Sequence, residues 1–165
     1  MNIFLKKLNP KKDISNDYLK WMNDFEITKY TEQKYKKHTI KDIKKFVNEK
    51  NKSNNEFLYG IFLKKKHIGN IKLGPINFIH KFAEISYFIG EKELWCKGYA
   101  TNAIKLIIKI AKRKDLKKLR AVFYRQDIGS ENVLINNYFK KEGVFKSEVQ
   151  FQNKRSDHIF YGKII

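Results

Sequence analysis

Short apolar runs separated by turn-forming residues predict a series of β-strands along this chain. The runs cover residues 3–8, 57–64, 67–76, 81–90, 118–125, 143–151 and 157–165. Each has the length and the share of aliphatic and aromatic residues expected of a strand. The pattern therefore predicts about seven strands.

Helical spacing of apolar residues marks a second kind of segment. After residue 99 the apolar positions recur at i, i+3, i+4, i+7, i+8 and i+11, as Ala100, Ala103, Ile104, Ile107, Ile108 and Ala111. This spacing predicts an amphipathic helix that ends at about Arg113. Residues 130–137 are predicted to form a shorter helix between the fifth and sixth strands.

Capping residues predict two more helices between the first and second strands. Ser15 or Asn16 can cap a short helix that ends near Asn23. Thr39 lies three residues before Asp42, which is the spacing of a capping box, and so opens the second helix.

The predicted order is β-α-α-β-β-β-α-β-α-β-β. This order favours an α/β fold of the α+β type, with a mixed, mostly antiparallel sheet and helices on both faces. Because no repeat, linker or shift in composition divides the chain, we expect a single domain over residues 1–165.

Composition narrows the function only slightly. The formal net charge is +19, but the 32 lysines are scattered and only 4 residues are arginine, the side chain that most often reads nucleic acid. We therefore predict a solvated basic surface and no nucleic-acid partner, with steering of an anionic ligand as the alternative.

No apolar run approaches the roughly 18 residues of a membrane span, and the N-terminus lacks the features of a signal peptide. The single cysteine, Cys96, excludes an internal disulfide. We expect a cytoplasmic protein that binds neither membrane nor metal, because no cluster of side chains has metal-ligand spacing.

The turn between the fourth strand and the long helix is the strongest functional signal. It contains one glycine, Gly98, and is followed by the helix start, where backbone amides have no partner within the helix. Such a turn can bind phosphate, although an ordinary turn has the same features. It is neither a P-loop nor a GxGxxG motif.

The residues around this turn, AEISYFIGEKELWCKGYATNAIKLI, resemble the acetyl-CoA-binding core of the GNAT N-acetyltransferase superfamily. They are most similar to the branch that includes ribosomal-protein N-terminal and amino-sugar acetyltransferases. The resemblance extends over nearly the whole chain, from YLKWMNDFEITKY to the last two strands. It implies the GNAT fold and direct attack of an amine on the thioester of acetyl-CoA.

The resemblance also implies how acetyl-CoA would be bound. Backbone amides of Phe88, Ile89 and Gly90 would hold the pantetheine and polarise the thioester carbonyl. The pyrophosphate would bind the amides of the turn, Trp95, Cys96, Lys97, Gly98, Tyr99, Ala100 and Thr101. Cys96 stands where the family often has glycine, and we expect it to be structurally neutral and not a nucleophile.

The implied catalytic residues depart in part from the family pattern. Glu84 is the candidate base, or else it pairs with a surface lysine, and Glu148 is the second candidate. Leu134 stands where many GNAT enzymes have a tyrosine acid, so Ser130 is the candidate for protonating the thiolate; it could also cap the helix. Asp127 replaces the asparagine of the family's NxxS motif at a pantetheine contact.

The acceptor is the least determined part. Candidate acceptor-binding residues come from the first helices and from the third strand with its turn: Trp21, Asn23, Tyr30, Tyr35, His38, Asn70, Asn77 and His80. The segment that begins at Gly69 resembles GNAT proteins of amino-sugar modification, which implies a primary amine on an amino sugar, free or linked to a nucleotide.

Three alternatives remain open for the acceptor and the activity. The acceptor could be a protein N-terminus, as in ribosomal-protein modification, or a polyamine or aminoglycoside. A non-catalytic module that binds CoA or nucleic acid is the alternative from another class, favoured by Leu134, Asp127 and the net charge of +19. A homodimer is compatible with each of them.

Overall fold

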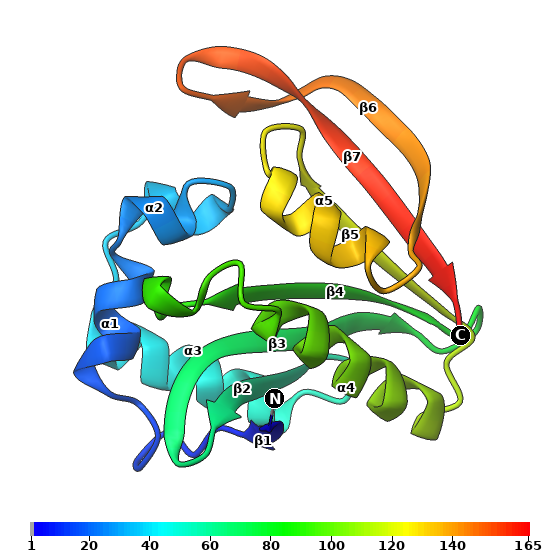
Figure 1. Cartoon of the computed structure of the whole chain (residues 1–165). Helices are drawn as coiled ribbons and strands as arrows, with labels where there is room; N and C mark the ends of the chain where they lie inside the picture. Colours follow the sequence, from blue (N-terminus) through cyan, green and yellow to red (C-terminus); the bar gives the residue numbers. More distant parts are fainter. Residues whose placement is uncertain (1) are drawn as a thin grey trace.

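In the computed structural model, which describes residues 2–165, all strands belong to one seven-stranded sheet with the order β1-β2-β3-β4-β5-β7-β6 (Figure 1). The strands are β1 (Ile3–Lys7), β2 (Phe57–Leu63), β3 (Lys66–Asn77), β4 (Phe82–Ile89), β5 (Lys118–Tyr124), β6 (Lys140–Phe151) and β7 (Lys154–Ile164). Neighbours pair antiparallel except β4 and β5, which are parallel. The predicted mixed, mostly antiparallel sheet is confirmed.

The helices are α1 (Asn16–Met22), α2 (Phe25–Thr28), α3 (Ile40–Lys52), α4 (Tyr99–Arg113) and α5 (Ile128–Ile135), with short 3₁₀ turns η1 (Glu32–Tyr35) and η2 (Lys92–Leu94). The sequence predicted two helices before β2, whereas the structure adds α2 and η1 there. Their cause is local, because Asp24 accepts a bond from the Glu26 amide and Thr31 from the Gln33 amide.

The predicted caps of the first helices are confirmed. The Ser15 side chain caps α1, and Thr39 and Asp42 form the capping box of α3. α5 begins two residues earlier than predicted because Asp127, and not Ser130, is its N-cap. The Ser130 amide donates a hydrogen bond to the Asp127 carboxylate at 3.0 Å.

Two apolar cores lie on opposite faces of the sheet. α4 and α5 cover one face, where Ile104 and Ile107 of α4 are fully buried against strand residues such as Ile71. α1 and α3 cover the other face, where Trp21 and Val47 pack on β2 (Figure 1). Helices on both faces were predicted, and this is confirmed.

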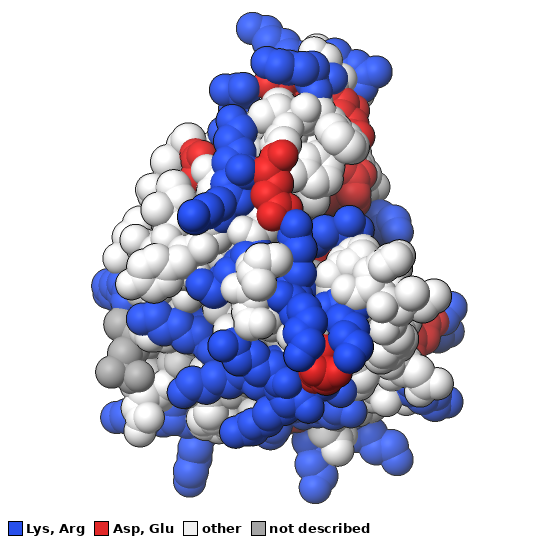
Figure 2. Space-filling model, turned by 90° about the vertical axis from the view of Figure 1, so that its right-hand side faces the viewer, with Lys and Arg blue, Asp and Glu red and all other residues white. Residues whose placement is uncertain are grey.

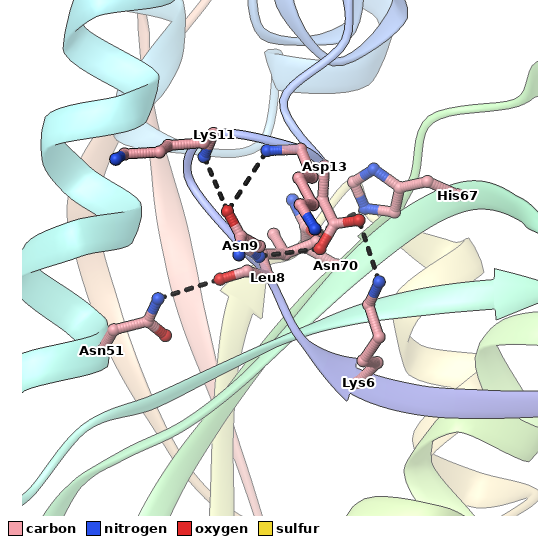
Figure 3. Close-up of polar contacts among 9 residues, drawn as sticks. Lys6, Leu8, Asn9, Lys11, Asp13, Asn51, His67 and Asn70 are labelled. Atoms are coloured by element: carbon pink, nitrogen blue, oxygen red, sulfur yellow. Dashed lines mark hydrogen bonds and ion pairs between the residues drawn. The ribbon is translucent and has the colours of Figure 1, made fainter.

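The connection between β1 and α1 is fixed by polar contacts (Figure 3). The Asp13 carboxylate accepts hydrogen bonds from Lys6 Nζ at 2.8 Å and from the Asn9 amide at 2.7 Å. Asn51 of α3 donates to the Leu8 carbonyl at 2.8 Å. These bonds tie the first helix layer to the edge of the sheet.

The strands β4 and β5 separate soon after they meet. Their pairing covers only Phe82 to Glu84 with Lys118 to Arg120, and β5 then continues beside β7. Figure 1 shows the two strands diverging toward α5 and the start of α4. We call this divergence the fork, with a closed end at Glu84 and an open end beyond it. Beyond Glu84, the edge of β4 that faces β5 has no strand partner.

Lysine and arginine side chains are spread over the face shown in Figure 2, with smaller groups of acidic residues among them. On this face the basic side chains do not form a single stripe. Within residues 2–165, no helix is long and apolar enough to cross a membrane. The same residues contain no group of three or more side chains that could hold a metal ion.

Candidate active site

The turn before α4 presents free backbone amides at a helix start. Gly98 is the N-cap of α4, with a left-handed φ of 78°, and it provides no side-chain cap. The first helical bond runs from the Asn102 amide to the Gly98 carbonyl at 3.0 Å. The amides before it therefore have no partner within the helix, namely those of Tyr99, Ala100 and Thr101. This arrangement fits an anionic group.

Cys96 adopts a conformation that favours glycine. Its φ is 58°, in the left-handed region, and its side chain is exposed. A side chain in this region costs about 1–2 kcal/mol. The backbone of the turn therefore retains the shape that a glycine at this position would allow.

The strand end before the turn is held by contacts within the protein. The Trp95 indole donates to the Ile89 carbonyl at 2.8 Å, and the Gly90 amide donates to the Ile68 carbonyl at 2.8 Å. A Cβ on Gly90 would lie 2.0 Å from the Trp21 ring. Because the Gly90 amide is already used inside the sheet, contacts of acetyl-CoA with residues 88–90 stay a prediction.

Glu84 lies at the closed end of the fork. Its carboxylate forms an ion pair with Arg120 at 2.6 Å, and the two residues are also register partners on β4 and β5. Glu84 does not line the cavity described below. The partner is thus an arginine of the neighbouring strand, whereas the alternative considered from the sequence was a lysine. Its role as the base stays a prediction.

Glu148, the second candidate base, lies on the β6–β7 hairpin. Its carboxylate is 2.7 Å from His158 Nδ1, beside the irregularity in pairing between Phe145 and Val149. The hairpin curves over α5 toward α2 (Figure 1).

Both the amide and the hydroxyl of Ser130 donate hydrogen bonds to the Asp127 carboxylate. Besides the amide bond, the Ser130 hydroxyl donates to Asp127 at 2.7 Å, so its proton points to a carboxylate. Leu134 is 1% exposed and belongs to the core. Neither side chain presents a free proton to the fork.

Tyr87 was missed from the sequence. It lies on β4 beyond the closed end, and its hydroxyl donates to the Ser130 carbonyl at 3.3 Å, across the open end of the fork. Burial raises the pKa of Tyr87; the bond to Ser130 lowers it and the nearby Asp127 carboxylate raises it further. The available signal was its position in the strand directly before the turn.

A cavity of about 780 Å³ lies between the α1–α3 layer and the sheet. Its aromatic and aliphatic walls include Met22, Phe46, Leu58 and Phe88, and Ser86 and Tyr87 bring it to the middle of β4. The size is that of a small-molecule site.

Two of the predicted acceptor residues, His38 and Asn70, line this cavity. Asn23 lies behind it and fixes His38, because its side-chain amide donates to the His38 carbonyl at 3.0 Å and its oxygen accepts from the His38 amide at 2.9 Å. Trp21 is 5% exposed and packs in the core.

The other predicted acceptor residues lie elsewhere. Tyr30 packs on Phe151 of the hairpin, and the Tyr35 hydroxyl donates to the Gln150 carbonyl at 3.4 Å. Asn77 accepts a bond from the His80 amide in the β3–β4 turn. Since the β3–β4 turn leads directly to the closed end of the fork, Asn77 and His80 are not brought to the cavity.

The cavity has a basic wall that the sequence did not identify. Lys36, Lys37 and Lys72 line it, and Asp42 is the one carboxylate among its lining residues. Lys72 pairs with Glu56 at 2.6 Å. Lys36 and Lys37 form no ion pair within residues 2–165, so they add uncompensated positive charge to this wall.

The floor of the cavity contains a buried amide. Asn70 is 3% exposed, and its oxygen lies 2.9 Å from His67 Nε2, beside Asp13 in Figure 3. Its side-chain nitrogen has no hydrogen-bond partner among the described residues that meets normal geometry. Burial lowers the pKa of His67 and raises that of Tyr18, a rise that the Asn70 amide partly offsets.

The family model "Acetyltransferase (GNAT) domain" matches residues 2–140. With the fork and the glycine turn, this match places the protein in the class of acyltransferases. The chain belongs to the GNAT acetyltransferase family and is an acetyl-CoA-dependent N-acetyltransferase, which confirms the resemblance found in the sequence. No curated protein matches the chain.

Several solved structures share this fold. A ribosomal L7/L12 alpha-N-protein acetyltransferase in complex with coenzyme A is 19% identical, with a TM-score of 0.89, over 100% of this chain and 95% of that one. A spermidine N-acetyltransferase from Vibrio cholerae with CoA and spermine is 20% identical, with a TM-score of 0.86, covering 98% and 95%. A microcin C7 self-immunity acetyltransferase with acetyl-CoA and AMP is 21% identical, with a TM-score of 0.84, covering 99% and 92%.

Proposed function

We propose that the protein transfers the acetyl group of acetyl-CoA to the primary amine of a small acceptor that also carries negative charge. A nucleotide-linked amino sugar, as the sequence suggested, is the first candidate. The lysine-lined cavity beside β4 is the observation that carries this proposal.

The donor would bind along the open end of the fork. The free amides of Tyr99, Ala100 and Thr101 would hold the pyrophosphate, with Lys97 and Lys105 as further positive charge. The unpaired edge of β4 would accept the pantetheine as an added strand. Bound there, acetyl-CoA supplies the activated acetyl group, and the protein aligns it with the amine.

The charge of the cavity favours an anionic acceptor over a cationic one. Three of its lining residues are lysines and one is an aspartate that is already bound to Thr39. A polyamine would be repelled by this wall, whereas a phosphate or carboxylate would be attracted. A protein N-terminus would favour an open, acidic groove. That the related microcin self-immunity acetyltransferase was solved with acetyl-CoA and AMP supports a nucleotide in this fold.

The test is to follow thiol release from acetyl-CoA with a matched panel of amines: amino-sugar nucleotides, neutral amino sugars, polyamines and peptides with free N-termini. We expect the highest kcat/KM with the charged sugars, decreasing as salt is added. Preference for polyamines or peptides would overturn the acceptor assignment. CoA binding without release from any amine would favour the non-catalytic alternative.

Paired variants sharpen the acceptor test. Replacing Lys36 and Lys37 by alanine should raise KM for the anionic acceptor about tenfold, equal to roughly 1.4 kcal/mol, and leave KM for acetyl-CoA unchanged. Lys44→Ala with Lys45→Ala is the control, since these exposed lysines of α3 do not line the cavity. If the two double variants raise KM equally, Lys36 and Lys37 act only through the general charge of the surface and do not bind the acceptor.

A further inference from the structure

We infer that the Tyr87 hydroxyl donates a hydrogen bond to the sulfur of CoA as the thioester breaks, and so is the residue that stabilises the leaving thiolate. The inference rests on the proposed function, because it requires acetyl-CoA in the fork. It assigns a catalytic role that neither the sequence pattern nor the family match gives to this residue.

The position of Tyr87 is the first argument. Tyr87 lies on β4 beyond the closed end, at a point where β4 also borders the acceptor cavity, and its ring packs toward α4 and α5 so that its hydroxyl reaches the Ser130 carbonyl. The hydroxyl therefore lies across the gap between β4 and β5, where the donor would pass, on a residue of the strand that also borders the cavity for the amine. The bonded atoms lie 43 residues apart in the chain.

The state of its hydroxyl is the second argument. At 3.3 Å, its bond to a neutral carbonyl is long for an O–H donor, whose usual distance is about 2.7–2.8 Å. A sulfur with developing negative charge is a better acceptor, because hydrogen bonds to ions are stronger than those to neutral groups. The hydroxyl can change partner without leaving a charge unpaired.

The alternative donors around the fork are engaged. The Ser130 hydroxyl donates to Asp127 at 2.7 Å. The hydroxyl of Tyr124 on β5 donates to Glu32 at 2.9 Å, and that of Tyr161 on β7 donates to Glu131 at 2.8 Å. Each of these three protons points to a carboxylate, which holds it more strongly than a thioester sulfur would.

The chemistry requires a hydrogen bond and not a complete proton transfer. As the amine nitrogen bonds to the acetyl carbon, the carbon–sulfur bond breaks and its electron pair goes to sulfur. Because a thiol has a pKa near 8.5 and burial raises that of Tyr87 above its usual value of 10, the proton stays on the tyrosine. The proton lost from the amine nitrogen reaches sulfur through solvent, which completes the amide and the free thiol.

The decisive experiment compares CoA with desulfo-CoA, using Tyr87→Phe, which keeps the ring. By calorimetry, we expect the affinity of the wild type for CoA to rise severalfold between pH 7 and pH 9, as the bound thiol ionises. This rise should be lost in Tyr87→Phe, while the affinity for desulfo-CoA stays equal in both proteins. An unchanged rise in Tyr87→Phe would overturn the inference.

Kinetics give a second measurement. Tyr87→Phe should lower kcat about 100-fold, the lower end of the effect of losing one preorganised donor, with both KM values within about threefold. The control is Tyr161→Phe, which also removes a hydroxyl bound to α5 and should leave kcat unchanged. Equal losses in the two variants would show that Tyr87 only holds α5 in place.

Failure of the inference is distinguishable from failure of the proposed function. If the wild type binds no CoA or releases no thiol with any amine, the proposed function fails. If the wild type is active, and its affinity for CoA changes with pH in the same way as that of Tyr87→Phe, only the role assigned to Tyr87 fails.

Discussion

The two ends of the fork use the same pair of strands differently. At the closed end, β4 and β5 are hydrogen-bonded, and Glu84 and Arg120 form an ion pair at 2.6 Å. At the open end the strands have separated, and one long bond from Tyr87 to Ser130 spans the gap. Groups that satisfy one another stabilise the fold, whereas weakly engaged donors are free for a ligand.

The lysines of the cavity also divide into paired and unpaired groups. Lys72 is paired with Glu56, which also pairs with Lys50. Lys36 and Lys37 are not paired within residues 2–165. We therefore expect substitutions at the closed end to change stability and those at the open end to change binding, except where the open end depends on close packing.

The largest loss of stability is expected where the open end depends on close packing, at Gly90. Gly90→Ala would place a Cβ 2.0 Å from the Trp21 ring, and Trp21 is buried and cannot move away. Overpacking of this kind costs about 1–3 kcal/mol, and we expect the upper end in urea unfolding. Gly143→Ala is the control, because no heavy atom lies within 4 Å of its Cβ position. Equal losses in the two variants would contradict the packing argument.

The next effect concerns the turn. Cys96→Gly should raise the free energy of unfolding by about 1 kcal/mol, since the left-handed φ of 58° penalises a side chain there. Gly98→Ala should lower it by a similar amount, because φ is 78°. Thermal unfolding of both variants tests the pair, and a loss of stability in Cys96→Gly would show that the thiol makes a compensating contribution.

The closed end should respond more weakly. The Glu84 and Arg120 side chains are 38% and 41% exposed, so solvent screening limits their pairing to about 0.5 kcal/mol in a double-mutant cycle. Activity separates the two roles of Glu84. If Glu84 only pairs, Glu84→Gln and Arg120→Met should change kcat alike. A loss of kcat confined to Glu84→Gln would support the base assignment.

The smallest effect at neutral pH concerns His67, behind the open end. Burial lowers the pKa of His67 below its ordinary value of 6.5, Asn70 and Asp13 oppose this shift, and Lys6 adds to it. Below pH 6.5 the unfolded chain therefore binds more protons, and stability should fall as pH decreases through this range. Above pH 6.5 no effect is expected.

Unfolding by urea at pH 7, 6 and 5 would measure the contribution of His67. The slope should be smaller in His67→Gln, which has no titrating group at this position. The carboxylate of Asp13 also titrates differently in the folded state, but its pKa is lowered from 3.8 and its window lies at lower pH. An unchanged slope in His67→Gln would assign the pH dependence to other groups.

Local patterns predicted the elements well. The cap at Ser15, the capping box of Thr39 and Asp42, and the end of α4 at Arg113 all follow from neighbouring residues, and the structure has each of them. The start of α5 was wrong by two residues because both Asp127 and Ser130 can cap. The sequence analysis considered Ser130 as a possible cap and did not consider Asp127, which is the cap in the structure.

The acceptor residues were harder to predict. Of eight candidates, His38 and Asn70 line the cavity, while Lys36, Lys37 and Lys72 were not considered. A polar residue near a predicted helix or turn has no sequence signal for the direction in which it points. Asn23 illustrates this, because its side chain is used to fix the backbone of His38.

The strands, the long helix, the glycine turn and the family could be predicted from the sequence, because they depend on periodicity and on residues close together in the chain. Which distant side chains meet depends on the tertiary structure. Tyr87 reaches Ser130, and Lys36 faces the same cavity as Lys72, because the sheet and its helices pack in one particular way. Such contacts arise from long-range packing and charge pairing, which leave no periodic signal in the chain.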